Sequence, residues 1–307
     1  MNRIEGLIAA AYPPLDQEGN LNVNAIGPYA EFLVKNKVNG VFLNGSTGDF
    51  VAMSLRERKL IVEEWRKCKP KDFVLMAHVG DTNIGISKEL AINAAQNEVD
   101  AIASIAPYYY KPKNVVQLVH VCKTIASVTP DIPYYYYHIP ELAGSNFDMI
   151  EFMELAAKDI PNFRGLKYTQ QDLMQFKSCL NFQGGRYDIL FGVDEILVCG
   201  LALGAKGGVG STYNHLAPIY HEIVNAFNNG QIEKAQQLQY QSMKFVKILS
   251  RYGFHRASKA TLGILGLDLG PVRLPDQNLT KMEIDSLEDD LRKSGILESI
   301  ETSKVSI

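Results

Sequence analysis

The sequence has no apolar run that is long enough to cross a bilayer. Its longest apolar stretch, residues 196–205, is interrupted by a cysteine and two glycines, whereas a membrane-spanning helix needs about 20 apolar residues. The amino terminus also lacks the pattern of a secretory leader, because residues 1–5 lead directly into a strand-like segment. We therefore expect no membrane association and no export.

Cysteine, excess charge and metal-ligand patterns are also scarce. Cys68, Cys122, Cys179 and Cys199 are widely separated, and no pair has ligand spacing, which indicates reduced core thiols in a cytoplasmic protein. The net charge of -3 and the lack of a basic stripe interleaved with aromatics argue against a nucleic-acid partner. The six histidines show no His-x-His or His-Glu-x-x-His spacing, so we expect no catalytic metal.

What the sequence does contain is a regular alternation of strand-like and helix-like segments. Successive strand ends lie 25 to 35 residues apart, which is the length of one strand and one helix. Eight strands that alternate with helices favour a closed parallel barrel over an open doubly wound sheet. The predicted strands are residues 6–11, 38–43, 73–79, 101–106, 132–137, 163–169, 188–193 and 205–212.

The composition is compatible with one large domain. With 307 residues, 46% hydrophobic and 21% charged, the chain has the size of a single (β/α)8 barrel of the α/β class, and no Pro/Gly/Ser-rich linker divides it. We predict that residues 1–215 form the barrel. Residues 216–307 would form its last helix and a carboxy-terminal helical extension packed on it, wholly helical from about residue 217 to 297. Ser54 and Glu57 have the spacing of a capping box, which predicts that a helix begins there.

Lys167 is the residue with the strongest chemical implication. Barrel enzymes carry out their chemistry at the carboxyl ends of the strands, and Lys167 lies near the end of the sixth predicted strand. Burial would lower the pKa of its amine from about 10.4, and a neutral amine forms Schiff bases with ketones. The alternative is a lysine that extends from the strand end to water. The residues of this strand alone leave both interpretations open.

Other strand ends carry candidate binding groups. The turn Gly45-Ser46-Thr47-Gly48 offers backbone N–H groups and two hydroxyls to a carboxylate or phosphate, although a plain strand-to-helix turn would have the same composition. Asp194 and Glu195 follow the seventh strand. They would either cap a helix or accept hydrogen bonds from a polyhydroxylated substrate at the barrel mouth.

A run of four tyrosines forms the fifth predicted strand. Alternate residues of a strand face opposite ways, so Tyr135 and Tyr137 share one face while the other two tyrosines share the other. A phenol inside the barrel beside an amine would act as a proton shuttle, with His138 as a competitor for that role. Tyrosine is also simply a good strand former.

Together these motifs resemble the pyruvate-dependent class I aldolases grouped with dihydrodipicolinate synthase and N-acetylneuraminate lyase. Four segments fall in the order and spacing of that family across essentially the whole chain, namely Gly45-Ser46-Thr47-Gly48, Tyr137-x-Ile139-Pro140, Gly165-Leu166-Lys167 and Gly192-Val193-Asp194-Glu195. The resemblance implies that Lys167 is the Schiff-base lysine and Tyr137 the acid/base tyrosine. It also implies a set of substrate-binding residues, which are Ser46, Thr47, Tyr109, Thr169, Gly192, Asp194, Glu195 and Ser211.

Within the family the sequence is similar to the lyase branch. The synthase branch usually has Thr-Thr where this chain has Ser46-Thr47, and an arginine for a second carboxylate where this chain has Leu142. The resemblance implies a cofactor-free homotetramer that reversibly cleaves N-acetylneuraminate, a sialic acid, to N-acetylmannosamine and pyruvate. One departure is Asp49, where the family usually has glutamate.

Other functions stay open at this point. Within the family the alternatives are a 2-keto-3-deoxy sugar acid aldolase and dihydrodipicolinate synthase. A metal-dependent aldolase on the same barrel would need a ligand cluster that the spacing does not provide. A non-catalytic sugar sensor should lack the lysine or the tyrosine, and the sequence has both.

Overall fold

The computed structural model describes residues 3–305 and contains a closed barrel of eight parallel strands, paired in the order of the sequence. The barrel closes between the first and last strands, where Ala9 lies opposite Gly210. Each predicted strand is present, and its ends differ from the prediction by at most two residues. The strands are β1 (Gly6–Ala10), β2 (Gly40–Leu43), β3 (Val74–His78), β4 (Ala101–Ile105), β5 (Tyr134–His138), β6 (Phe163–Tyr168), β7 (Asp188–Phe191) and β8 (Gly207–Gly210). The prediction of a (β/α)8 barrel is confirmed.

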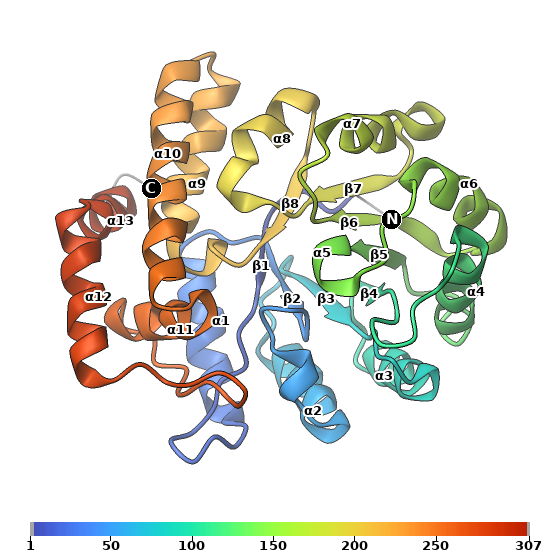
Figure 1. Cartoon of the computed structure of the whole chain (residues 1–307), viewed down its shortest axis with the longest axis horizontal. Coiled ribbons are helices and arrows are strands. Elements are labelled where there is room, and N and C mark those ends of the chain that lie inside the picture. Colours follow the sequence, from blue (N-terminus) through green and yellow to red (C-terminus); the bar gives the residue numbers. More distant parts are fainter. Residues whose placement is uncertain (1–2, 306–307) are drawn as a thin grey trace.

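Helices cover the outside of the barrel (Figure 1). The predicted capping box is present, since the Ser54 hydroxyl accepts from the Glu57 N–H and the Glu57 carboxylate accepts from the Ser54 N–H. Capping side chains begin other helices in the same way. Each accepts a hydrogen bond from a backbone N–H group that the first turn of the helix leaves unpaired. The helices around the barrel are α1 (Ile26–Lys35), α2 (Leu55–Cys68), α3 (Ile84–Gln96), α4 (Val115–Ala126), α5 (Pro140–Ala143), α6 (Met149–Asp159), α7 (Leu173–Asn181) and α8 (Leu197–Leu203).

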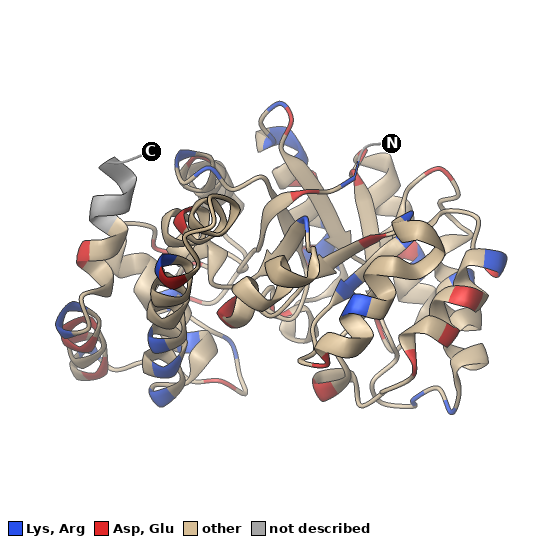
Figure 2. Cartoon of the chain, turned by 90° about the horizontal axis from the view of Figure 1, so that it is seen from above, with Lys and Arg blue, Asp and Glu red and all other residues tan. Residues whose placement is uncertain are grey.

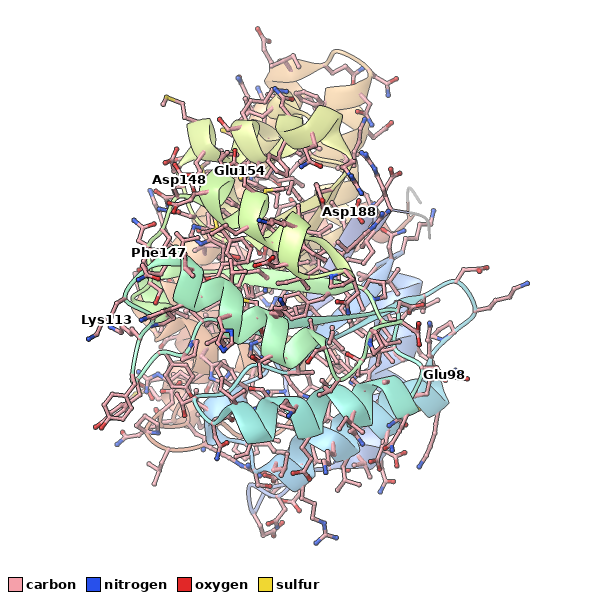
Figure 3. The ribbon with its side chains drawn as sticks, turned by 90° about the vertical axis from the view of Figure 1, so that its right-hand side faces the viewer. Glu98, Lys113, Phe147, Asp148, Glu154 and Asp188 are labelled. Atoms are coloured by element: carbon pink, nitrogen blue, oxygen red, sulfur yellow. The ribbon has the colours of Figure 1, made fainter. Side chains whose placement is uncertain are left out.

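The two ends of the barrel differ in which loops they carry. In Figure 3, Lys113 and Phe147, from the loops after β4 and β5, lie on the left, at the carboxyl ends of the strands. Glu98 and Asp188, at the amino ends of β4 and β7, lie on the right. Loops at the left-hand end therefore position the candidate site residues.

Both faces of the strands are buried, as expected for a parallel sheet covered by helices. The tyrosines of β5 divide as predicted. Tyr135 donates a hydrogen bond from its hydroxyl to Asp188 at 2.8 Å, on the same face as Tyr137, while the Tyr136 ring packs against Phe152 of α6, with 4.6 Å between ring centres. One pair therefore faces the interior and the other lies under the helices.

The carboxy-terminal region forms a block of helices beside the barrel (Figure 1). The prediction that it is wholly helical is wrong for residues 265–280, which contain no helix. Gly266 and Gly270 adopt positive φ angles of 90° and 72°, and two prolines that follow cannot continue a helix. The helices of this block are α9 (Tyr213–Asn228), α10 (Ile232–Arg251), α11 (Phe254–Ile264), α12 (Lys281–Lys293) and α13 (Ile296–Val305).

The surface agrees in part with the sequence-based interpretation. No helix within residues 3–305 is long and apolar enough to cross a membrane. Figure 2 shows Lys and Arg interspersed with Asp and Glu over the outer helices. Cys122 and Cys179 are buried free thiols, but Cys199 is exposed on α8 and Cys68 is partly exposed. The interpretation of all four cysteines as core residues is therefore wrong.

Candidate active site

Lys167 and Tyr137 lie side by side inside the barrel. They are directly opposite each other in the register of the paired strands β6 and β5, and only 4% and 3% of their surfaces are exposed. The Lys167 Nζ lies 3.9 Å from the centre of the Tyr137 ring and 4.1 Å from the centre of the Phe42 ring. The alternative in which Lys167 extends to water is therefore wrong, because aromatic rings enclose the amine.

Burial also changes the chemistry of this amine. Desolvation lowers the pKa of Lys167, and the Tyr137 side chain and the Asp194 charge oppose the shift only in part. No ion pair to Lys167 is present among the described residues. A larger share of the amine is therefore neutral than in an exposed lysine, and the neutral form is the nucleophile.

The Tyr137 hydroxyl points toward the turn after β2, where it lies 3.4 Å from Ser46 Oγ. Its ring packs edge-on against Phe42 and His78, with ring centres 5.5 and 5.9 Å apart. His138 faces the other side of β5, where it is fully buried and its Nε2 lies 2.7 Å from Gln170 Oε1. Of the two candidates for proton transfer, only Tyr137 reaches the interior.

The turn that carries Ser46 and Thr47 is held in a tight conformation. The residues at its two ends, Asn44 and Asp49, have positive φ angles of 55° and 48°. The Asp49 N–H donates to the Ser46 carbonyl at 3.0 Å. Both hydroxyl side chains are partly exposed toward the interior of the barrel mouth. We refer to residues 44–49, where the sequence predicts a site for a carboxylate or phosphate, as the carboxylate loop.

A cavity of about 560 Å³ opens at this end of the barrel. Nine of the ten predicted site residues line it, which are Ser46, Thr47, Tyr137, Lys167, Thr169, Gly192, Asp194, Glu195 and Ser211. The tenth, Tyr109, is 75% exposed and packs on Tyr110 outside the cavity. The structure of the single chain therefore does not bring Tyr109 to the site.

Gly192 and Thr169 fit together at the side of the cavity. The Thr169 hydroxyl is buried without a hydrogen-bond partner in the described part of the chain, which leaves it available to a ligand. A Cβ atom added at Gly192 would lie 2.1 Å from that hydroxyl oxygen. Only glycine therefore leaves room for Thr169 at this position.

Asp194 and Glu195 lie in the short turn η4 (Asp194–Ile196) at the end of β7. The Asp194 carboxylate does not cap this turn. It accepts hydrogen bonds from the Thr212 N–H, at 2.7 Å, and from the Thr212 hydroxyl. Burial raises the pKa of Asp194, against the effect of these donors. Burial and the neighbouring Asp194 charge raise the pKa of Glu195 to about 7.

Some residues at the cavity have no counterpart in the sequence analysis. Tyr12 follows β1, and Phe254 and His255 come from α11 in the carboxy-terminal block. Gln239 of α10 lies behind η4, where it accepts from the Val198 N–H and donates to the Asp194 carbonyl. Tyr12 was recognisable as a strand-end residue, whereas nothing local marks the other three. Among the side chains that the structure describes, which are those of residues 3–300, no cluster of three or more His, Cys, Asp or Glu would hold a metal ion.

Comparison with known sequences places this site in a family. A sequence model of the dihydrodipicolinate synthetase family matches residues 3–294. The chain belongs to this family. The resemblance inferred from the motifs is thereby confirmed.

Relatives and solved structures within the family are similar over nearly the whole chain. N-acetylneuraminate lyase A of Xenopus laevis is 38% identical, covering 89% of this chain and 90% of that protein. The human N-acetylneuraminate lyase is 36% identical, covering 96% and 94%. The structure of N-acetylneuraminate lyase from Proteus mirabilis superposes with a TM-score of 0.93 at 34% identity, covering 96% of this chain and all of that one.

Proposed function

We propose that this chain is a class I aldolase that reversibly cleaves N-acetylneuraminate to N-acetylmannosamine and pyruvate through a Schiff base on Lys167. The observation that carries the proposal is the buried amine, 3.9 Å from the Tyr137 ring in a cavity lined by hydroxyls and carboxylates. The relatives named as N-acetylneuraminate lyases support the choice of substrate.

In the proposed reaction the substrate is cleaved through a Schiff base and an enamine on Lys167. The neutral Lys167 amine adds to the C2 ketone of the open-chain sugar acid, and loss of water leaves a protonated Schiff base. Tyr137 donates the proton that leaves with this water, and its phenolate then takes the proton of the C4 hydroxyl, directly or through the substrate carboxylate, as the C3–C4 bond breaks. The bonding electrons move into the iminium, which gives an enamine of pyruvate and free N-acetylmannosamine. Protonation at C3 and hydrolysis then release pyruvate and restore the amine.

Two groups of residues bind the substrate in this proposal. Ser46 and Thr47 hold the carboxylate and so orient C2 toward the amine, an effect of proximity and preorganised dipoles. The hydroxyls of the sugar tail bind on the opposite side of the cavity. That side is formed by Thr169, Gly192, Asp194, Glu195 and Ser211.

Leu142 favours the sugar over the substrate of the synthase branch. It lines the cavity and is 61% exposed, so it presents an apolar surface where a second carboxylate would need a cation. The acceptors on the other side suit hydroxyl groups, because a site that is built to pair with hydroxyls strongly discriminates against substrates that lack them.

We also propose a cytoplasmic homotetramer in which residues 216–307, of which 306–307 lie outside the described residues, form one domain with the barrel. Helix α9 packs against β1 and β8, and α10 packs against η4, which supports a single domain. Tyr109 and Tyr110 are 75% and 87% exposed, and such a pair of aromatic residues is suited to an interface between subunits. In sedimentation, a fully active monomer would rule out the assembly.

Trapping with borohydride tests the chemistry. Reduction in the presence of pyruvate should inactivate the enzyme and leave an adduct on the peptide that contains Lys167, and Lys167→Ala should fold but lose the adduct and nearly all turnover. An adduct on Lys206 or Lys111 instead would contradict the assignment.

A panel of 2-keto acids tests the substrate. We expect cleavage of N-acetylneuraminate and no condensation of pyruvate with aspartate semialdehyde. If the condensation is faster than the cleavage, the sugar is the wrong substrate, while the Schiff base on Lys167 still holds.

A further inference from the structure

His255 reaches the cavity from outside the barrel and is held in one orientation. Its ring stacks on Tyr12, with 5.7 Å between ring centres and 28° between planes, and its Nδ1 lies 3.7 Å from the Asp276 carboxylate. Tyr12 follows β1, and Asp276 belongs to the non-helical segment 265–280. Contacts from two separate parts of the chain therefore set the direction of the other ring nitrogen.

That nitrogen, Nε2, is buried and has no hydrogen-bond partner within the described residues. Thr47 and His255 both line the cavity. Burial lowers the pKa of His255, while the Asp49 charge and the Thr47 backbone act against the shift, so two residues of the carboxylate loop influence the ring. A buried polar atom without a partner costs free energy, and Thr47 offers a backbone carbonyl that can accept from Nε2.

The same loop is also held electrostatically at Asp49. The positive charges of Lys259 and Arg273, together with His255, stabilise the Asp49 carboxylate against the effect of its burial. The Lys259 amine is fixed by the carbonyls of Pro13, at 3.0 Å, and Pro271, at 2.5 Å. All three groups lie in the carboxy-terminal block, so charges of that block act on the loop at Asp49.

We propose that His255 positions the carboxylate loop, donating a hydrogen bond from Nε2 to the Thr47 carbonyl when a 2-keto acid occupies the cavity. The inference rests on the proposed function and deepens it. His255 acts through Thr47 and does not touch the reacting atoms. Its effect is on how the loop presents its N–H and hydroxyl groups to the substrate carboxylate. The loop binds this carboxylate equally in the ground state and in the transition state, so a weaker loop contact should raise KM and leave kcat nearly unchanged.

The test compares His255→Ala, His255→Gln and the control His221→Gln. His221 lies on the outside of α9, where its Nε2 is 3.0 Å from the Lys37 carbonyl, remote from the cavity. For His255→Ala we expect the pyruvate concentration for half-maximal borohydride trapping, and KM, to rise about tenfold with kcat nearly unchanged, as for the loss of uniform binding. The glutamine amide replaces Nε2 and should recover most of the affinity. The control should match the unmodified enzyme.

Other outcomes would overturn the inference. If His255→Ala raises KM for N-acetylneuraminate but not the pyruvate concentration for trapping, His255 binds the sugar tail. A fall in kcat at constant KM would also contradict loop positioning. If His255→Ala does not fold, Asp276→Ala removes the carboxylate that lies 3.7 Å from Nδ1, outside the cavity, and should weaken pyruvate trapping in the same direction; unchanged trapping would refute the inference. Failure of the unmodified enzyme to form any pyruvate adduct would instead refute the proposed function and this role with it.

Discussion

Replacing Tyr137 by phenylalanine removes one oxygen atom from the centre of the cavity and leaves the ring in place. The ring keeps its edge-on contacts with Phe42 and His78 and its position beneath the Lys167 amine. The lost hydroxyl has one long contact, 3.4 Å to Ser46 Oγ. Ser46 is partly exposed, so water can replace the lost partner. We therefore expect the free energy of unfolding to fall by less than about 1 kcal/mol.

The expected effect on turnover is much larger. A general acid/base contributes about 10²- to 10⁴-fold to the rate, which corresponds to roughly 3 to 5 kcal/mol in the activation free energy. If Tyr137 moves the C4 hydroxyl proton, kcat for cleavage of N-acetylneuraminate should fall by that factor. Schiff-base formation with pyruvate should persist, because the Lys167 amine is retained.

A matched control is available two residues earlier in the same strand. Tyr135 also faces the interior, but its hydroxyl donates to the buried Asp188 carboxylate at 2.8 Å, at the amino end of the barrel. Tyr135→Phe leaves that acceptor short of a partner and should cost about 1–3 kcal/mol of stability, with kcat unchanged. Urea unfolding and steady-state release of pyruvate measure the two quantities for both variants.

The reasoning fails if Tyr137→Phe keeps the kcat of the unmodified enzyme. The proton would then pass to water or to the substrate carboxylate alone. His138 is not an alternative acceptor, because it faces the helices and is engaged by Gln170. Equal losses of stability and activity in both variants would likewise contradict a chemical role that is specific to Tyr137.

Three further predictions follow from the environment of single residues. The pKa of Glu195 is raised to about 7, so its side chain is the charged carboxylate that accepts sugar hydroxyls only above that pH. KM for N-acetylneuraminate should therefore rise as the pH falls through 7. If this pH dependence survives in Glu195→Gln, the prediction is wrong. Gly192→Ala places Cβ 2.1 Å from the Thr169 hydroxyl and should lower the unfolding free energy, which a second change, Thr169→Ala, should partly restore. Hydrogen bonds from Arg273 hold the pKa of Glu57 at about 2 instead of 4.5. This pair therefore stabilises the fold above pH 4.5, and the stabilisation is lost as the pH falls toward 2. In urea unfolding, Glu57→Gln should cost about 1–2 kcal/mol at neutral pH and nothing near pH 2.

Much of the candidate site could be predicted because its residues lie at the carboxyl ends of the barrel strands. A residue at the carboxyl end of a barrel strand points to the common mouth, so Lys167 and Tyr137 were expected to meet, and they are opposite each other in the register. The resemblance to the family placed Tyr109 at the site, but the segment after β4 leaves this side chain exposed. His255 and Gln239 could not be found this way, because helices outside the barrel carry them.

The sequence by itself determined the order and type of the barrel elements, since apolar runs, capping residues and turn residues act over a few neighbouring positions. It also determined which chemical groups lie at the strand ends. Only the tertiary structure decided that the Lys167 amine is enclosed by rings, that Asp194 is fixed by Thr212, and that His255 of the carboxy-terminal block lines the same cavity as Thr47. The physical reason is that burial and electrostatic environment are properties of all the atoms around a group, and most of those atoms come from distant parts of the chain.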